Sequence, residues 1–156
     1  MPDSRAPLQD IDRVASALVA CLPALHRGLE RRVGQEFPHP RLPDGQLALL
    51  FLVEERRGIT VREAAEALLM KPNNVSALVS QLTDQDLLER RQDPADKRVA
   101  HLHPTATARE RLAEARLLKE EHLARALRTL TDGDLDALGA ALGALESLAG
   151  RLHPAG

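Results

Sequence analysis

The chain has 156 residues and a formal net charge of −2, with 21 Lys and Arg against 23 Asp and Glu. This near balance excludes proteins that hold nucleic acid through an overall excess of positive charge, so any such binding must come from a local patch. No apolar run approaches the roughly 20 residues of a membrane-spanning helix, and we expect neither a membrane partner nor a signal peptide. Cys21 is the single cysteine, so no disulfide can form within the chain, which favours a cytoplasmic protein.

The first part of the chain predicts a long helix followed by a proline-rich linker. Over residues 10–35 the apolar side chains recur with a heptad-like spacing, which is typical of helices that pack against other helices. Pro23 lies inside this stretch and should bend the helix. A further helix is expected from Pro43, closed at Gly58.

Two short helical patterns follow in tandem. In each, four apolar residues have the i, i+3, i+4, i+7 spacing that places them on one face of a helix. They are Val61, Ala64, Ala65 and Leu68 in the first pattern and Val75, Leu78, Val79 and Leu82 in the second. Helices this short cannot each bury a core alone, so they should pack on each other and on a third element. A short helix, a tight turn and a second helix form a helix-turn-helix.

Capping signals set the limits of these helices. Thr60 and Glu63 match a capping box, and Pro72 suits the first turn of a second helix predicted over residues 72–84. The side chains pointing away from the apolar face of that helix are short and uncharged: Asn73, Asn74, Ser76, Ala77, Ser80 and Gln81. Asn and Gln can pair with adenine, Ser can bond to any base, and Ala leaves room for a thymine methyl. This face is therefore a candidate for reading DNA bases, and an ordinary solvated face is the alternative.

Residues 87–103 predict a two-stranded hairpin, because two alternating runs flank a tip that contains Pro94 and acidic residues. Arg98 near the tip could enter a DNA minor groove, whose negative potential attracts Arg. Asp96 could hold the Arg98 side chain extended through a charge-assisted bond. Three further cations are placed to meet phosphates: Arg90, Arg91 and Lys97. A hairpin with mixed surface charge and no ligand is the alternative.

Together these motifs resemble the MarR family of bacterial winged helix-turn-helix transcriptional regulators. The resemblance covers residues 43 to about 108 and rests on Ala-Ala-x-x-Leu in the first short helix, Val-Ser-x-Leu-Val-x-x-Leu in the second, and Leu-Leu-x-Arg and Asp-Pro-x-Asp-Lys-Arg in the hairpin. It implies a mainly α fold with a small β-hairpin wing, in which a winged helix-turn-helix lobe is joined to a helical dimerisation lobe. It also implies that Arg98 enters the minor groove with Asp96 as its partner.

Three positions depart from the family pattern. Asp86 stands where the family usually has Gly before the first wing strand, and Ala106 replaces a second Gly after the wing. Lys71 replaces the usual small hydroxyl cap of the second helix, which puts a cation where the helix dipole disfavours one. A nearby phosphate would relieve that cost, so Lys71 is a candidate DNA contact.

The last part of the chain predicts two more helices. Thr105 could cap one that runs to about Leu130, and Asp132 or Asp134 starts the other. In the last helix, residues 135, 138, 142, 145 and 152 form a heptad seam of leucines. The apolar stripes at both ends of the chain favour a dimer interface, and an intramolecular bundle is the alternative. We expect a dimerisation helix and linker over 1–42, a DNA-binding lobe over 43–106 and dimerisation helices over 107–156.

Other kinds of function find little support. The chain has no Gly-rich phosphate loop and no nucleophile with a base at a recognisable spacing, so we expect neither an enzyme nor a cofactor. His101 and His103 alternate along a wing strand, where phosphate or solvent contact is favoured over a metal. Cys21 lies among apolar neighbours, and the chain has no Tyr to hold a thiolate, so a packed interfacial thiol is favoured over a redox sensor.

We therefore expect a dimeric, sequence-specific regulator that binds a pseudo-palindromic repeat in double-stranded DNA through residues 72–84 and 87–103. The family resemblance implies a homodimer, repression as the default and a small-molecule effector that releases the DNA. Two alternatives stay open: a redox-sensing regulator acting through Cys21, and a winged-helix module that binds a protein instead of DNA.

Overall fold

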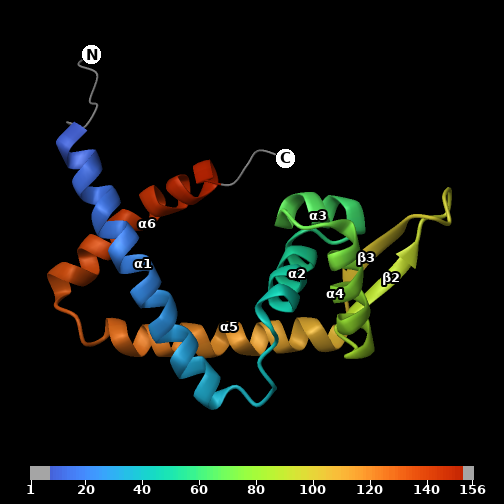
Figure 1. Cartoon of the computed structure of the whole chain (residues 1–156). Coiled ribbons are helices and arrows are strands. Elements are labelled where there is room, and N and C mark those ends of the chain that lie inside the picture. Colours follow the sequence, from blue (N-terminus) through green and yellow to red (C-terminus); the bar gives the residue numbers. More distant parts are fainter. Residues whose placement is uncertain (1–7, 153–156) are drawn as a thin grey trace. The chain divides into compact units, whose positions relative to one another are not determined.

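The computed structural model describes residues 8–152, with side chains from residue 10 onwards. It is 72% helical with a small three-stranded antiparallel sheet (Figure 1), which confirms the predicted fold class. The chain divides into two compact units. The winged unit comprises residues 33–118, and the described part of the helical unit comprises residues 8–32 and 119–152.

The winged unit holds the predicted helix-turn-helix and hairpin. Its elements in chain order are α2 (Asp44–Glu55), β1 (Ile59–Thr60), α3 (Val61–Leu68), α4 (Pro72–Asp84), β2 (Leu88–Gln92) and β3 (Ala100–Pro104), followed by the start of α5 (Ala106–Leu127). The bounds of α4 are those predicted for the second short helix, and β2 and β3 form the predicted hairpin, with its tip at the far end of the two strands (Figure 1).

The sheet has one strand that the sequence did not predict. Its order is β1-β3-β2, and Ile59 of β1 pairs with Leu102 of β3. A strand of two residues has no alternating pattern to detect, so only its pairing with β3 defines it. Gly58 leads into it with a φ of +87°, a left-handed conformation that favours glycine, and its N–H donates to the carbonyl of Leu102 at 2.8 Å.

The core of the winged unit joins the helices to the sheet. Its buried apolar residues come from α2, α3, α4, the sheet and α5: Leu49, Leu50, Val53, Ile59, Ala64, Ala65, Val75, Val79, Leu82, Leu87, Leu88, Leu102 and Ala108. The apolar faces predicted for α3 and α4 therefore meet a shared core, as expected for helices too short to bury one alone. Burial of these side chains is the main term that stabilises the unit.

The caps of the helix-turn-helix confirm the sequence prediction. Thr60 Oγ1 accepts from the N–H of Glu63 at 3.2 Å, and Glu63 Oε2 accepts from the N–H of Thr60 at 2.8 Å. Helix α3 ends at Leu68, and its C-cap residue Leu69 has a left-handed φ of 54° and a side chain 94% exposed. Pro72 is the first residue of α4, where its missing N–H breaks no helical bond.

In α5 the start agrees with the prediction and the end differs. Thr105 Oγ1 accepts from the N–H of Ala108 at 3.1 Å, so the predicted cap is confirmed. The helix ends at Leu127 rather than near Leu130, because the chain there closes with i→i+3 bonds. One of these runs from the N–H of Leu130 to the carbonyl of Leu127 at 3.1 Å.

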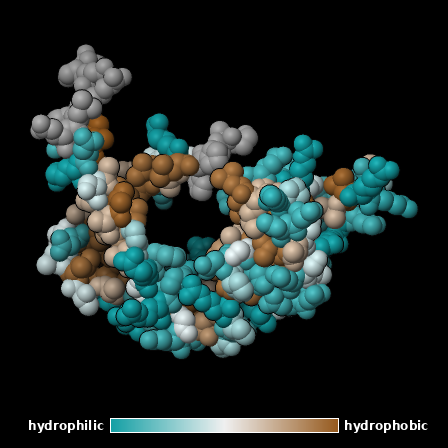
Figure 2. All heavy atoms as spheres, viewed as in Figure 1, coloured by the Kyte–Doolittle hydropathy of each residue, from teal (hydrophilic) through white to brown (hydrophobic). Residues whose placement is uncertain are grey.

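The helical unit contains most of α1 (Leu8–Glu36), the end of α5 and all of α6 (Asp132–Leu152). Helix α1 continues through Pro23, and Thr131 caps α6 by accepting from the N–H of Asp134 at 3.2 Å. Figure 2 shows apolar side chains, in brown, at the surface of α1 and α6. The exposed ones include Ile11, Val14, Val19, Leu22, Leu25, Leu135, Leu138, Leu142, Leu145, Leu148 and Leu152. No described residue of α6 is buried.

Within residues 8–152, none of the helices combines the length and the apolar composition needed to cross a membrane.

Candidate nucleic-acid interface

Helix α4 presents the predicted polar face to solvent. Val75, Val79 and Leu82 are buried beneath it. The side chains on the outer face are exposed, and they are Asn73, Asn74, Ser76, Ala77, Ser80 and Gln81. An exposed, uncharged helix face of this width suits entry into a major groove, because no charged side chain must lose its hydration there.

Lys71 is the N-cap residue of α4, and its side chain makes no capping bond. It is exposed and stands at the positive end of the helix dipole. The N-terminus of α4 therefore concentrates positive charge from two sources, the dipole and the Lys71 side chain. This is the arrangement that a phosphate group would stabilise.

The structure joins two predicted contact residues to each other. Arg90 Nη2 donates to Ser80 Oγ at 3.1 Å, and Ser80 Oγ donates to the carbonyl of Ser76 at 3.1 Å. The Ser80 hydroxyl therefore uses its hydrogen within α4 and one lone pair on the wing. Of the two, the Arg90 guanidinium keeps more unused donors for a ligand.

Gln81 also has partners inside the winged unit. Its Oε1 accepts from Gln46 Nε2 of α2 at 3.0 Å, and Gln46 Oε1 accepts from Gln85 Nε2 at 3.0 Å. Gln46 is only 8% exposed, so this amide cluster satisfies a buried polar side chain between α2 and α4. The Gln81 side chain is thus directed toward α2, although the residue is exposed.

The wing tip is built by two aspartates acting on backbone amides. Asp93 Oδ1 accepts from the N–H groups of Ala95 at 2.8 Å and Asp96 at 3.1 Å. Asp96 Oδ1 in turn accepts from the backbone N–H of Arg98 at 3.0 Å. The expected bond from Asp96 to the Arg98 guanidinium is thus replaced by one to the Arg98 amide, because the tight turn aims that carboxylate at the main chain.

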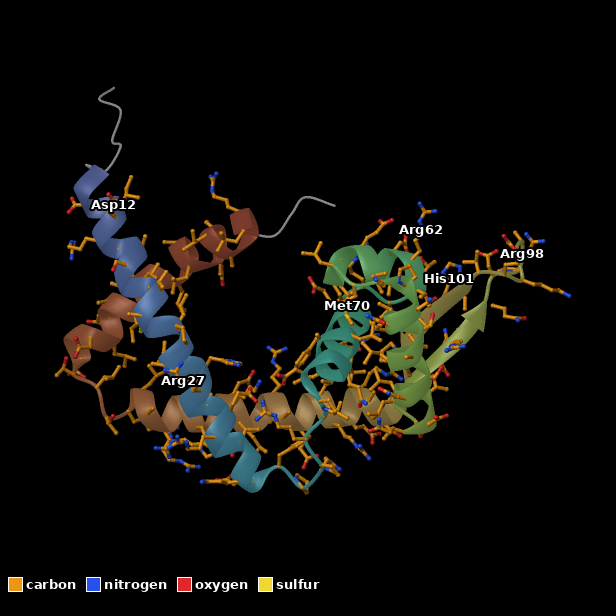
Figure 3. The ribbon with its side chains drawn as sticks, viewed as in Figure 1. Asp12, Arg27, Arg62, Met70, Arg98 and His101 are labelled. Atoms are coloured by element: carbon orange, nitrogen blue, oxygen red, sulfur yellow. The ribbon has the colours of Figure 1, made fainter. Side chains whose placement is uncertain are left out.

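Arg98 and Lys97 are exposed at the tip of the wing. Figure 3 shows Arg98 at the end of the hairpin that points away from the rest of the winged unit. A long cationic side chain placed there can extend from the protein surface, as entry into a minor groove requires.

Adjacent arginines of β2 lie on opposite faces of the sheet, because side chains alternate along a strand. Arg90 faces α4, whereas Arg91 faces outwards and contacts Glu89 through Nε at 3.0 Å and Nη2 at 2.5 Å. The sequence placed both arginines toward phosphates, and the structure puts only Arg90 beside α4.

His101 lies in a different environment from the one predicted. Its Nδ1 is 2.8 Å from the carbonyl oxygen of Gly58, and its Nε2 is 2.8 Å from Asp93 Oδ2. The bond to Asp93, followed by the bond to Gly58, raises the pKa of His101, and the bond to His101 is the main cause that lowers the pKa of Asp93. The sequence predicts phosphate or solvent contact for this ring, and this prediction is wrong because protein oxygens contact both of its nitrogens.

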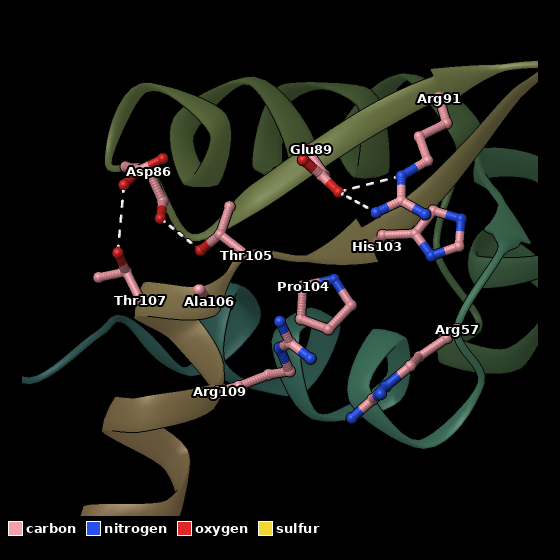
Figure 4. Close-up of a pocket in the computed structure, with 10 residues that line it drawn as sticks. All are labelled: Arg57, Asp86, Glu89, Arg91, His103, Pro104, Thr105, Ala106, Thr107 and Arg109. Carbon is pink, nitrogen blue, oxygen red and sulfur yellow. Dashed lines mark hydrogen bonds and ion pairs between the residues drawn. The ribbon is translucent and has the colours of Figure 1, made fainter.

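The outer face of the wing borders a cleft of about 560 Å³, drawn in Figure 4. Its lining comes from the end of α2, the wing strands and the start of α5: Arg57, Asp86, Glu89, Arg91, His103, Pro104, Thr105, Ala106, Thr107 and Arg109. Burial and then the charge of Arg91 lower the pKa of His103. Arg57 is paired with Glu54 at 2.6 Å and Arg91 with Glu89, so much of the positive charge here is already neutralised within the protein.

Asp86, which stands where the family usually has Gly, has a left-handed backbone conformation. Its φ is 56°, its carbonyl accepts from Thr105 Oγ1 at 2.6 Å, and its Oδ2 accepts from Thr107 Oγ1 at 3.2 Å (Figure 4). Asp tolerates the left-handed region better than most residues, and these two bonds offset part of the remaining strain.

Residues 8–152 bring together no group of three or more His, Cys, Asp or Glu side chains that could hold a metal ion. Cys21 is exposed on α1 in the single chain, so the packing predicted for its thiol requires a partner surface.

An exposed helix-turn-helix beside a wing on a three-stranded sheet defines a winged helix-turn-helix protein. Residues 42–99 match the model of the MarR family, so the predicted resemblance is confirmed. The chain has the fold of a MarR family transcriptional regulator. No curated protein sequence matches it.

Solved structures extend the similarity over nearly the whole chain. A proposed transcriptional regulator from Pseudomonas aeruginosa PA01 is 27% identical with a TM-score of 0.75, over 92% of this chain and 98% of that one. A MarR family protein from Bacillus stearothermophilus is 17% identical with a TM-score of 0.68, over 88% and 96%. A variant of MepR from S. aureus, bound to an oligodeoxyribonucleotide, is 17% identical with a TM-score of 0.61, over 93% and 99%. At 17% identity, the B. stearothermophilus and S. aureus structures show that the fold is shared.

Proposed function

We propose that this protein is a homodimeric transcriptional regulator that binds a pseudo-palindromic site in double-stranded DNA. One observation carries the proposal: the uncharged, exposed face of α4 lies beside a wing whose tip exposes Arg98 and Lys97. Such a surface can read bases in a major groove while the wing reaches the neighbouring minor groove. The MepR variant, which shares the fold, is bound to an oligodeoxyribonucleotide, and this supports the same use of the fold here.

Each residue of this surface has a proposed role. Asn73, Asn74, Ser76 and Ala77 contact base edges, since they are exposed on the outer face of α4. Phosphates are contacted by Lys71 at the start of α4, by Arg90 beside Ser80 and by Lys97 at the tip, while Arg98 enters the minor groove. Asp96 supports Arg98 through the backbone bond described above. Ser80 and Gln81, which also bond to Arg90 and Gln46, contribute further contacts from α4 to the DNA.

The test is binding of the purified protein to DNA from upstream of its own gene, measured by fluorescence anisotropy over a series of salt concentrations. Arg98→Ala should weaken binding at least tenfold, because a buried charge-assisted contact is lost. Arg41→Ala is the matched control, since Arg41 is exposed, lies outside α4 and the wing, and carries the same charge. Equal affinities of the two variants, or no preference of the wild type over random duplex, would contradict the proposal and favour a protein-binding module.

The proposed dimer rests on the apolar faces of α1 and α6. Leucines at 138, 142 and 145 are 43%, 57% and 38% exposed in the single chain, although they follow a heptad spacing. A second copy of the chain would cover these faces and also the exposed Cys21. A dimer would place two copies of α4 about 34 Å apart, the repeat of the DNA helix, which suits a pseudo-palindrome.

Leu142→Glu tests the dimer, because a carboxylate at the centre of the seam must be desolvated when two copies associate. Light scattering should give twice the mass of one chain for the wild type and a lower mass for the variant. Asp136→Lys, a change of charge on the same helix outside the seam, is the control. A wild type that is monomeric at micromolar concentration would contradict the proposal.

We further infer repression as the outcome of DNA binding and release of the DNA by a small-molecule effector, both from the family resemblance. Thermal-shift screening of small molecules, followed by DNA-release measurements, tests the effector. A compound that stabilises the protein and lowers its DNA affinity would support it, because the two bindings are then coupled.

A further inference from the structure

We propose that His101 and Asp93 are positioning residues for the wing: the charged His101 ring, held between Asp93 and Gly58, fixes the turn that carries Arg98. This inference rests on the proposed DNA-binding function. It concerns a ring that lies in β3, behind the tip, as Figure 3 shows for His101 and Arg98.

The geometry around His101 requires two donors on one ring. Nδ1 faces the carbonyl oxygen of Gly58 and Nε2 faces a carboxylate oxygen of Asp93, each at 2.8 Å. A carbonyl and a carboxylate can only accept hydrogen bonds, and a neutral imidazole has a single N–H. The protonated ring therefore satisfies both contacts, whereas the neutral ring leaves one oxygen facing a lone pair.

The Asp93 carboxylate links the His101 ring to the turn at the tip of the wing. While Oδ2 binds the ring, Oδ1 accepts from the amides of Ala95 and Asp96 at 2.8 and 3.1 Å. Asp96 then accepts from the amide of Arg98 at 3.0 Å. A continuous series of hydrogen bonds thus runs from the ring in β3 to the residue proposed to enter the minor groove.

The other end of the series reaches the helix-turn-helix. Gly58 precedes β1, and β1 leads directly into the capping box of α3 formed by Thr60 and Glu63. His101 also pairs with Thr60 in the sheet register. The ring therefore ties the turn at the tip to the backbone from which α3 begins, and its loss should loosen that turn while the pairing of β1 with β3 remains.

The charged groups facing His101 come from four elements: Asp93 at the tip, Glu63 of α3, Arg91 opposite it on β2, and His103 on β3. The Asp93 bond is the main cause that raises the pKa of His101, and the charge of Glu63 adds to it. Burial and Arg91 lower the pKa of His103. The pKa values of two histidines on one strand are thus shifted in opposite directions, so His103 serves as an internal control.

The pH dependence follows from the sign of this shift. Because the folded pKa of His101 is raised, the tie is fully formed below the ordinary histidine value of about 6.5 and is lost as the pH rises through the raised value. DNA affinity should therefore fall with rising pH, by about two- to tenfold, the effect of one hydrogen bond.

The experiment compares the wild type with three variants by anisotropy on one duplex, at fixed ionic strength, between pH ~5.5 and ~8.5. His101→Gln should lower the affinity at the acidic end and remove the slope, since both N–H donors of glutamine lie on one nitrogen and cannot replace two separate ring nitrogens. Asp93→Asn should keep affinity at the alkaline end and so remove the fall with rising pH, because an amide can donate to a neutral ring and still accept from the turn amides. His103→Gln should keep the wild-type slope.

NMR titration of the histidine Cε1–H signals in the free protein supplies a second readout. His101 should titrate above the ordinary value in the wild type and lose that shift in Asp93→Asn. A wild type that binds no duplex at any pH would contradict the proposed function, and the NMR titration would still decide whether the tie exists. The positioning role is overturned if His101 titrates normally, if His101→Gln binds like the wild type, or if His103→Gln alone removes the slope.

Discussion

The guanidinium of Arg90 and the hydroxyl of Ser80 join the wing to helix α4, with Nη2 donating to Oγ at 3.1 Å. Arg90 belongs to β2 and Ser80 to the exposed side of α4, so this bond links the two parts of the proposed DNA surface. Both residues were predicted from the sequence as separate DNA contacts. In the structure they are hydrogen-bonded to each other.

This bond predicts coupling between the two residues. In a double-mutant cycle of urea unfolding, Ser80→Ala and Arg90→Gln should show a coupling free energy of about 0.5 kcal/mol, a modest value because the pair is exposed. Ser76→Ala is the control, since only the Ser76 carbonyl takes part in the contact. Strictly additive effects of the two substitutions would show that the bond does not hold the wing.

Lys71 predicts opposite effects on stability and binding. Lys71→Ser should raise the free energy of unfolding by about 1 kcal/mol, because the new hydroxyl caps α4 and the cation leaves the positive end of its dipole. The same change should weaken DNA binding and reduce the slope of log affinity against log salt by about 1. Lys71→Ala, which loses the charge without gaining a cap, separates the two effects. Unchanged salt dependence in both variants would remove Lys71 from the phosphate contacts.

The left-handed backbone conformation of Leu69 predicts that glycine would be more stable at this turn of the helix-turn-helix. Its φ of 54° is strained for leucine, and its side chain is 94% exposed, so little packing is lost when it is removed. Leu69→Gly should raise the free energy of unfolding by about 1 kcal/mol, measured by urea denaturation. Leu69→Ala keeps the strained φ and should give no such gain. Equal stabilities of the Gly and Ala variants would contradict this explanation.

Asp86 separates backbone strain from side-chain bonding. Asp86→Ala keeps the φ of 56° and loses the bond from Thr107, so it should destabilise the protein by about 1 kcal/mol. Asp86→Gly loses the same bond but relieves the strain, so its stability should stay close to that of the wild type. Thermal denaturation of both variants checks the difference. A Gly variant as unstable as the Ala variant would show that the bond to Thr107 dominates.

Glu63 predicts an acid-sensitive cap on α3. Its bond to the Thr60 amide is the main cause that lowers the pKa of Glu63. The stabilisation is therefore present above the ordinary value of 4.5 and is lost as the pH falls through the lowered value. Glu63→Gln keeps an acceptor for Thr60 without a charge, so its stability should depend less on pH between about 6 and 3. Urea denaturation at both pH values checks this, and an identical acid loss in the two proteins would contradict it.

The helices of the winged unit could be predicted because their signals are local. The apolar spacing of residues 72–84, the capping box of Thr60 and the position of Pro72 each depend on neighbours within one or two helical turns. The strand β1 could not be predicted, because two residues carry no period and are defined only by pairing with β3, some forty residues later.

The same contrast between local signals and long-range pairing applies to the residues of the candidate site. Exposure of Asn73, Asn74 and Ser76 follows from helix periodicity, and exposure of Arg98 follows from its place in a hairpin tip. The contact between Asp93 and His101 was not predicted from the sequence, although Asp93 belongs to the wing motif. Their contact depends on the hairpin register, which no local pattern specifies.

The sequence by itself determined the winged helix-turn-helix, the polar outer face of its second helix and its resemblance to the MarR family. Periodicity, caps and turn residues act over a few positions, so they can be read along the chain. Only the tertiary structure decided which polar groups satisfy each other: Ser80 with Arg90, Gln81 with Gln46, and His101 with Asp93. These pairs are fixed by packing and strand register, because a hydrogen bond forms only where folding brings a donor within about 3 Å of an acceptor.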